Sequence, residues 1–286
     1  MPTTNGEGMK MIELPEAMTI AKQMNYELKG KKIEYGNRGN SPHKFAFYNR
    51  PPEEYESILK DKTIGDVRDC GSLILTSVEP NYTLVFGGGG ERILFHQNEK
   101  TLPKKYQILL NFDDETYLTV TVQGWGSAQL YDQAETTKNP YLTNPGVSPI
   151  SDEYTFEYFQ GLFDDLKERD PRSAKFFIIS KPGIQGVGNG YSQDILFRAK
   201  IHPRRRVIEL ADYEKMALYK AIKETLIQAV DMGGRDDEHD LYNNTGKYKR
   251  ILDSRTNGTP CPECGTTIEK ISFLGGASYF CPSCQV

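Results

Sequence analysis

The sequence lacks the features that would place it among secreted, membrane-spanning or strongly basic proteins. Only five of the 286 residues are cysteine, and four of them lie from Cys261 onward. One cysteine cluster without a signal peptide does not match a disulfide-linked secreted protein. No apolar run approaches the roughly eighteen residues of a membrane span. We therefore expect no membrane contact and a cytoplasmic protein, associated with the nucleoid if the organism is prokaryotic.

Neither net charge nor histidine content identifies a ligand. The formal net charge is −4, which gives no global support for nucleic-acid binding, although local patches steer polyanions better than net charge does. The stretch 198–206 holds five cations and no acid. The four histidines show no metal-ligand spacing, and Cys70 stands apart from the other cysteines.

The C-terminal cysteines form the clearest motif. Cys261 and Cys264 make one CxxC pair, Cys281 and Cys284 make a second, and sixteen residues separate the pairs. This is the ligand spacing of a four-thiolate zinc site, with a disulfide framework as the alternative. Because four thiolates leave no open coordination position, we expect one structural Zn²⁺. The segment 266–280, with Gly275 and Gly276 near its centre, predicts a β-hairpin that brings the pairs together.

Hydrophobic periodicity predicts a β-rich region followed by a helical one. Apolar residues at helical spacing predict a helix over 16–28, behind Pro15. Alternating runs bounded by turns at 79–81 and 113–114 predict an antiparallel sandwich or barrel. These runs cover 73–76, 83–86, 107–112 and 117–122.

A Pro/Asn/Gly-containing linker over 139–149 is the best domain boundary, and the period becomes helical beyond it. Helices are expected over 154–166, 192–200 and 212–232, the last ending at Gly233 and Gly234. The glycine-containing stretch 183–191 lies outside any parallel βαβ unit, so it predicts a tight turn with exposed amides rather than a dinucleotide fingerprint.

In this order of elements, the chain resembles the formamidopyrimidine-DNA glycosylase / endonuclease VIII family. The similarity is carried by four segments: 12–16, which resembles Pro-Glu-Leu-Pro-Glu; 186–203, which resembles a helix–two-turn–helix; 240–248; and the ribbon 261–285. The resemblance implies an α+β multi-domain protein. Its parts would be a disordered leader (1–11), an N-terminal β-sandwich (12–147), a helix–two-turn–helix domain (148–255) and a zinc ribbon (256–286).

The resemblance also implies a partner and its contacts. Family members bend duplex DNA and flip a damaged base out of the stack. By position, the residues that would bind the DNA backbone are Lys175, Asn189 and Tyr191. Gln123 and Trp125 would lie in the loop that enters the duplex, with Trp125 as the aromatic wedge. The alternative for Trp125 is a side chain packed in the core. Glu13 would be the general acid and Glu16 its support, although Glu13 also suits a solvated residue before a helix.

Three positions depart from the family pattern. The family's nucleophile is an N-terminal proline amine, but the aligned residue is Ile12, whose nitrogen is an amide with a delocalised lone pair. The family's lysine aligns with Ser72, or with the segment 104–106 in an alignment that needs a long insertion. The hairpin arginine aligns with Gly276, which predicts weaker phosphate binding.

These departures lead to one hypothesis and two alternatives. The first is a monomeric DNA-binding protein on a repair-glycosylase scaffold that recognises damaged or abasic duplex DNA, with its Schiff-base glycosylase/AP lyase chemistry lost or reduced. The second is an active glycosylase that uses another amine, such as Lys105, or water activated by Glu13. The third is a scaffold used for protein or RNA contacts.

Overall fold

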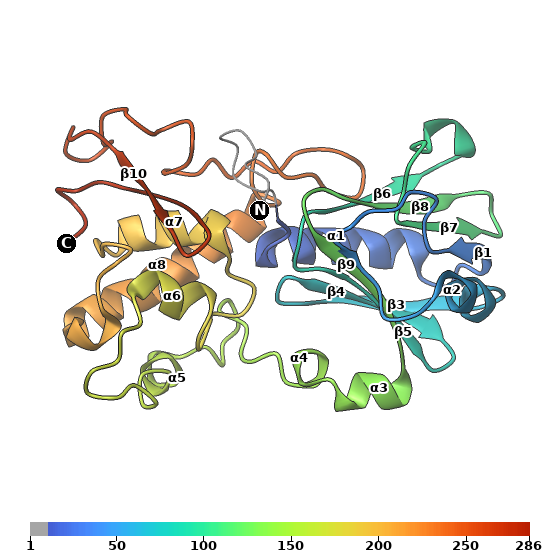
Figure 1. Ribbon diagram of the computed structural model, residues 1–286, viewed down its shortest axis with the longest axis horizontal. Helices are drawn as coiled ribbons and strands as arrows, with labels where there is room; N and C mark the ends of the chain where they lie inside the picture. Colours follow the sequence, from blue (N-terminus) through green and yellow to red (C-terminus); the bar gives the residue numbers. More distant parts are fainter. Residues whose placement is uncertain (1–10) are drawn as a thin grey trace. The chain divides into compact units, whose positions relative to one another are not determined.

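The chain divides into two compact units (Figure 1). The structure is a computed structural model that describes residues 11–286, so the predicted leader lies outside the described residues except for Met11. Among the described residues, the β-rich unit contains 11–145 together with Met232–Tyr248, and the helical unit contains Gly146–Asp231 and Lys249–Val286. The segment Met232–Tyr248 thus groups with the β-rich unit, whereas the division from sequence includes it in 148–255.

Two sheets build the β-rich unit. In the five-stranded sheet the order is β2-β9-β5-β4-β3, and in the four-stranded sheet it is β1-β7-β8-β6. All pairs are antiparallel except β2 with β9, which run parallel through Ala46 and Gly126. The strands are β1 (Ile33–Asn37), β2 (Ala46–Phe47), β3 (Thr63–Cys70), β4 (Leu73–Glu79), β5 (Tyr82–Gly87), β6 (Glu91–His96), β7 (Ile108–Phe112), β8 (Tyr117–Val122) and β9 (Gly126–Asp132).

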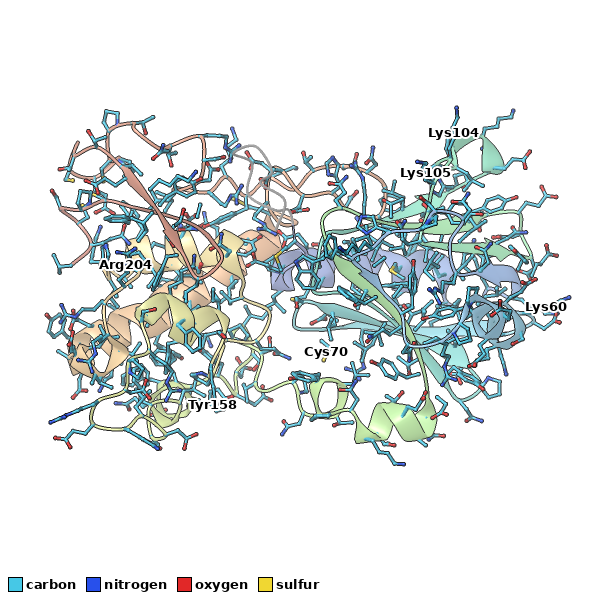
Figure 2. All side chains as sticks on the ribbon, viewed as in Figure 1. Lys60, Cys70, Lys104, Lys105, Tyr158 and Arg204 are labelled. Carbon is cyan, nitrogen blue, oxygen red and sulfur yellow. The ribbon has the colours of Figure 1, made fainter. Side chains whose placement is uncertain are left out.

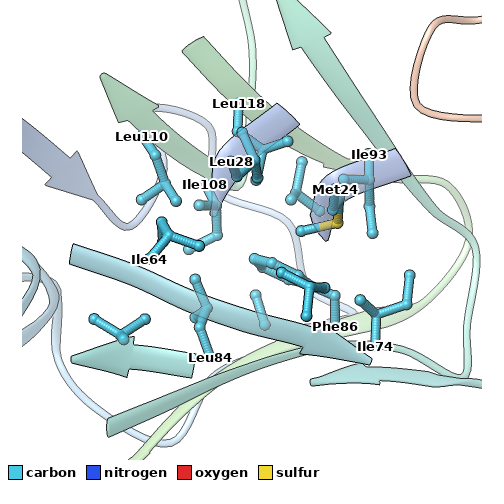
Figure 3. Close-up of a cluster of buried hydrophobic side chains, with 14 of the residues drawn as sticks. Met24, Leu28, Ile64, Ile74, Leu84, Phe86, Ile93, Ile108, Leu110 and Leu118 are labelled. Atoms are coloured by element: carbon cyan, nitrogen blue, oxygen red, sulfur yellow. The ribbon is translucent and has the colours of Figure 1, made fainter. Parts of the chain in front are cut away.

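Helix α1 (Leu14–Leu28) supplies one wall of the core of this unit. It begins two residues before the predicted start because Glu13 and Glu16 form a reciprocal capping box, in which the Glu13 N–H donates to Glu16 Oε2 at 3.1 Å. Figure 3 shows Met24 and Leu28 of this helix beside side chains from both sheets. Such a shared buried core is what joins two sheets into a sandwich.

Short helices lie between the strands of the sandwich and after its last strand. Among them, α4 carries Leu142 onto a small apolar cluster with Cys70, Leu75 and Val85 on the five-stranded sheet. The connecting helices are α2 (Pro52–Leu59), the 3-10 turn η1 (Glu99–Thr101), α3 (Gln133–Lys138) and α4 (Pro140–Thr143).

The helical unit contains α5 (Phe156–Gly161), α6 (Ala174–Ile179), α7 (Asn189–Arg198), the 3-10 turn η2 (Val207–Glu209) and α8 (Asp212–Asp231). Helix α7 begins at Asn189, three residues before the predicted start, because Gly188 is its extended N-cap. Helix α5 is shorter than predicted, and α6 was not predicted. Helix α8 ends as predicted before Gly233 and Gly234, which have φ values of 70° and 92°.

The C-terminal hairpin packs within the helical unit. Strands β10 (Glu269–Phe273) and β11 (Gly276–Phe280) pair antiparallel around Leu274 and Gly275, as expected. Tyr279 and Ile268 share an apolar cluster with Phe197 of α7. The α+β class, with a sandwich, a helical region and a C-terminal cysteine ribbon, is confirmed. Within residues 11–286, no helix has the length and apolarity of a membrane span.

Candidate functional site

Ile12 lies where a glycine-rich turn follows β5. Its peptide nitrogen donates a hydrogen bond to the carbonyl of Gly89 at 2.9 Å, and only 3% of the residue is exposed. An amide nitrogen has no available lone pair, and here its proton is also engaged by the carbonyl. Position 12 therefore presents a buried, hydrogen-bonded peptide group in place of a free amine.

The same turn, Gly87–Gly90, also forms backbone hydrogen bonds with Ser72 and Trp125. The Gly88 N–H donates to the Ser72 carbonyl at 2.9 Å, and the Gly90 N–H donates to the Trp125 carbonyl at 2.8 Å. Only glycine fits these approaches: a Cβ at residue 87 would lie 2.3 Å from the Ser72 oxygen, and one at residue 89 would lie 2.5 Å from the Trp125 oxygen. Three predicted site positions, 12, 72 and 125, thus converge on one turn.

The side chain of Glu91 is hydrogen-bonded to this turn. Its buried carboxylate accepts the Gly89 N–H at 2.9 Å and the Ser127 N–H at 2.6 Å. Burial raises the pKa of this carboxyl group, against the opposing effect of its hydrogen bonds. Glu91 thus joins the glycine turn at Gly89 to Ser127, which follows the Trp125 loop, so it is a positioning residue that sequence inspection did not identify.

Glu13 and Glu16 both pair with Arg235. The guanidinium Nη1 donates to Glu13 Oε1 at 3.2 Å, while Nε and the backbone N–H of Arg235 donate to Glu16 Oε1 at 3.2 and 2.9 Å. All three side chains are nearly inaccessible to solvent. A buried charge is tolerated when it is paired and hydrogen-bonded, which this arrangement achieves. Both predicted catalytic carboxylates are therefore engaged in one ion-pair cluster.

The backbone N–H and carbonyl of Met11 are both hydrogen-bonded to side chains around Arg235. Its N–H donates to Glu238 Oε1 at 3.0 Å, and its carbonyl accepts a hydrogen bond from Arg235 Nη2. The pKa of Glu238 is raised to about 7, chiefly by burial and also by the charges of Glu16 and Asp237, while Arg235 opposes the shift. The backbone preceding Ile12 is thus bound by specific contacts.

Gln123 is exposed at the start of the Trp125 loop, and Trp125 itself is half-buried. The Gln123 N–H donates to the Gly90 carbonyl at 2.7 Å. A cavity lined by Gln123, Glu91 and Glu238 has a volume of ≈ 20 Å³. That is room for about one water molecule, so in this conformation the cavity does not accommodate a nucleobase.

In the helical unit, Lys175 is buried beneath the hairpin. Its ammonium Nζ donates to Ser278 Oγ at 2.8 Å and to the carbonyl of Phe273 at 3.2 Å, and 1% of the residue is exposed. Desolvation lowers the pKa of Lys175 to about 8. Here Lys175 holds the turn of the hairpin, so its predicted phosphate contact requires a rearrangement of these bonds.

Asn189 opens helix α7 and touches the hairpin. Its Nδ2 donates to the Ala277 carbonyl at 3.2 Å. Gln193, one turn later, donates to the same carbonyl at 2.9 Å and accepts the Tyr279 N–H at 3.0 Å. Tyr191 is fully buried, so its ring does not face solvent at the predicted DNA contact. Asn189 is half-buried at the start of the helix, where backbone N–H groups favour anions.

The four cysteine sulfurs of the ribbon gather in one cluster. The Sγ atoms of Cys261, Cys264, Cys281 and Cys284 all lie within 4.8 Å of one another. The Cys261–Cys284 and Cys264–Cys281 separations are 3.9 and 3.4 Å. Tetrahedral zinc with Zn–S bonds near 2.3 Å requires sulfurs about 3.8 Å apart, whereas disulfides require about 2 Å. The donor set fits a structural zinc ion, which the ribbon binds.

Sequence inspection missed four members of these sites, one of which is Glu91. Arg235 and Glu238 come from a segment more than two hundred residues after Glu13, so no local pattern connects them. Gln193 lies inside a helix and shows no motif. The four consecutive glycines 87–90 are a local signal that could have located the turn, because glycine in a strand region often marks a close backbone approach.

The fold and the thiolate cluster define a zinc-ribbon protein with a β-sandwich and a helical region. Residues 146–239 match the formamidopyrimidine-DNA glycosylase H2TH domain, and residues 258–286 match the zinc finger found in FPG and IleRS. The formamidopyrimidine-DNA glycosylase of Halalkalibacterium halodurans is 30% identical, with 96% of this chain and 100% of that protein covered. The corresponding protein of Cytobacillus firmus is 29% identical over the same share of each chain.

Solved structures show the same fold. The Lactococcus lactis Fpg in complex with DNA containing an abasic site superposes with a TM-score of 0.81 at 23% identity, covering 96% of this chain and 99% of that one. A complex of the Lactococcus lactis enzyme with a N7-Benzyl-Fapy-dG containing DNA gives 0.82 at 23% identity and the same coverage. The chain belongs to the formamidopyrimidine-DNA glycosylase family.

Proposed function

We propose that this protein binds damaged or abasic duplex DNA and does not form a Schiff base with deoxyribose through residue 12. Relatives named as glycosylases, and solved structures of the same fold that hold abasic DNA, support the choice of ligand. The observation that carries the chemical part is the buried peptide nitrogen of Ile12, engaged by the Gly89 carbonyl. Schiff-base formation needs a free amine at this place.

The surroundings of Ile12 support the loss of this chemistry. The position aligned with the family's lysine is Ser72, whose carbonyl binds the glycine turn. Glu13, the aligned general acid, is paired with Arg235. A carboxylate engaged in a buried ion pair must give up that pairing before it can serve a reacting sugar, which costs free energy.

Binding of the DNA backbone is assigned to the helical unit. The start of α7 at Asn189 is the expected place for a phosphate, because the N-terminus of a helix favours an anion. The zinc-bound hairpin rests on Asn189 and Gln193 through the Ala277 carbonyl. Contacts of this kind do not read sequence, so they suit recognition of a lesion by the deformability of the duplex.

Equilibrium binding to three probes tests the proposal. An abasic-site duplex, the same duplex fully paired and an RNA of equal length are titrated over a salt series. We expect tighter binding of the abasic duplex, and Asn189→Ala should weaken both DNA duplexes by a similar factor. Equal affinity for all three probes would contradict the proposal and favour a scaffold with another partner.

A further inference from the structure

Three consecutive arginines follow helix α7, and the first of them differs from the other two. Arg205 forms ion pairs with Glu209 and Glu214. Arg206 also pairs with Glu209. Arg204 is exposed and forms no ion pair among residues 11–286. Because no carboxylate of the fold neutralises Arg204, its charge is available to an external anion.

The guanidinium group of Arg204 lies against the zinc-ribbon hairpin. Its central carbon is 5.2 Å from the centre of the Phe273 ring on β10, which is a cation–π contact. Figure 2 shows Arg204 in the helical unit, beside this hairpin. Phe273 is the cross-strand partner of Gly276 on β11. Arg204 thus contacts the neighbour of the glycine that stands where the family pattern has an arginine.

Hydrogen bonds fix the turn that carries Arg204. The Arg204 N–H donates to His202 Nδ1 at 3.1 Å. The Pro203 carbonyl accepts a hydrogen bond from the Lys175 N–H at 3.2 Å, which joins the turn to the start of α6. The side chain of Lys175 in turn donates to the Phe273 carbonyl at 3.2 Å, so the turn, α6 and the hairpin are linked. The backbone of Arg204 is therefore supported on both sides.

We propose that Arg204, from the turn after α7, supplies a phosphate contact of duplex DNA at the hairpin, where the hairpin has no arginine of its own. A guanidinium stacked on an aromatic ring keeps N–H donors at the edge of its plane, and two of them can bind one phosphate. The stack also restricts the side chain before binding, which lowers the entropy cost of association.

This assignment rests on the proposed function for its ligand. The hairpin that contacts Arg204 through Phe273 also accepts a hydrogen bond from Asn189 through the Ala277 carbonyl. It therefore connects Arg204 with the start of α7, where the proposed function expects the DNA backbone. A contact with a backbone phosphate does not read sequence, so it should be the same in damaged and in intact duplexes.

Equilibrium binding of an abasic duplex and of the same duplex fully paired, each over a salt series, tests the assignment. Arg204→Ala should weaken binding of both duplexes by about tenfold, the low end for a hydrogen bond to a charged group. It should also make the slope of log affinity against log salt shallower by about 1. Arg204→Lys keeps the charge but loses the planar stacked group, so it should keep the slope and lose part of the affinity.

Arg206→Ala is the matched control, because it removes the same charge two residues away, from a side chain that is paired with Glu209. It should leave both slopes unchanged. The zinc content of each variant shows whether the hairpin is still folded. If Arg204→Ala loses zinc, Arg204→Lys decides, and an affinity equal to that of the parent protein would then overturn the assignment.

The outcomes separate this inference from the proposed function. Equal affinity of the parent for the abasic and the paired duplex would contradict the proposed function, yet a shallower slope in Arg204→Ala would still support the phosphate contact. Affinities and slopes of Arg204→Ala equal to those of the parent would overturn the contact. An equal change in Arg206→Ala would also overturn it, because net charge would then account for the effect. So would a loss confined to the abasic duplex, since both probes contain the backbone phosphates.

Discussion

The peptide nitrogen of Ile12 donates to the carbonyl of Gly89 at 2.9 Å, in a turn that also binds Ser72 and Trp125 through their carbonyls. In the family the aligned residue supplies the reactive amine, so here a structural hydrogen bond occupies the position of a nucleophile. Arg235 binds Glu13, Glu16 and the Met11 carbonyl around it. The position is thus integrated into the fold of the β-rich unit.

Arg235→Ala should destabilise the β-rich unit strongly. Removing the guanidinium leaves Glu13 and Glu16 buried without their partner, and breaking such a pair costs about 3–5 kcal/mol. Urea denaturation measures the loss. Arg68→Ala is the control, because Arg68 is exposed on β3 and a surface substitution changes stability by about 0.5 kcal/mol or less. Equal stability of the two variants would refute a structural role for the cluster.

Lys175 should make stability depend on alkaline pH. Its pKa falls from 10.5 to about 8 on folding, so between pH 8 and 10.5 the unfolded chain binds more protons at this residue. By linkage, this residue's contribution raises the free energy of unfolding across that window. Below pH 8, Lys175 is protonated in both the folded and the unfolded protein. The folded protein then bears the full desolvation cost of the buried ammonium group.

Lys175→Met provides the comparison. The free energy of unfolding of both proteins is measured by urea denaturation between pH 7 and 10.5. As the pH rises, the parent protein should gain stability relative to Lys175→Met. A difference that stays constant across the window would show that Lys175 titrates normally.

Cys261→Ser should release zinc and disorder the hairpin. The remaining three thiolates lose much of the binding free energy that also stabilises the ribbon. Metal content measured by plasma emission should fall from one zinc per chain to near zero, with weaker duplex binding because the hairpin contacts Asn189. Cys70→Ser, at a residue away from the cluster, should keep its zinc. Full metal content in Cys261→Ser would contradict the assignment.

Gly276→Arg should strengthen duplex binding. An added Cβ would lie 3.4 Å from Asn189 Nδ2, which the half-buried amide can accommodate by a small shift. A new phosphate contact should steepen the slope of log affinity against log salt by about 1. Gly276→Ala controls for the backbone effect. An unchanged slope in Gly276→Arg would mean that the hairpin does not face a phosphate.

Much of the fold was predictable because its signals are local. The CxxC spacing, the α1 periodicity and the four predicted strand runs each lie within a few neighbouring residues, and all are confirmed. Helix α6 was missed because six residues rich in phenylalanine and isoleucine carry no helical period. The Arg235 cluster and the burial of Lys175 depend on contacts across roughly a hundred to two hundred residues, which a single sequence does not reveal.

A free amine at position 12 should allow Schiff-base formation if the rest of the scaffold is competent. A variant that begins at residue 12, with Ile12→Pro exposed by removal of an initiator methionine, carries a secondary amine beside Glu13. We expect it to form a borohydride-stable adduct with abasic DNA, more strongly when combined with Ser72→Lys. No adduct in either variant would show that a free amine at position 12 is not sufficient for Schiff-base formation.

Borohydride trapping of the 286-residue chain on an abasic-site duplex tests the central claim most directly. The proposed function predicts binding of that duplex by gel shift but no covalent protein–DNA band on a denaturing gel. A trapped band at or above the level of the Ile12→Pro variant would contradict it, because an amine elsewhere in the chain would then be performing the reaction.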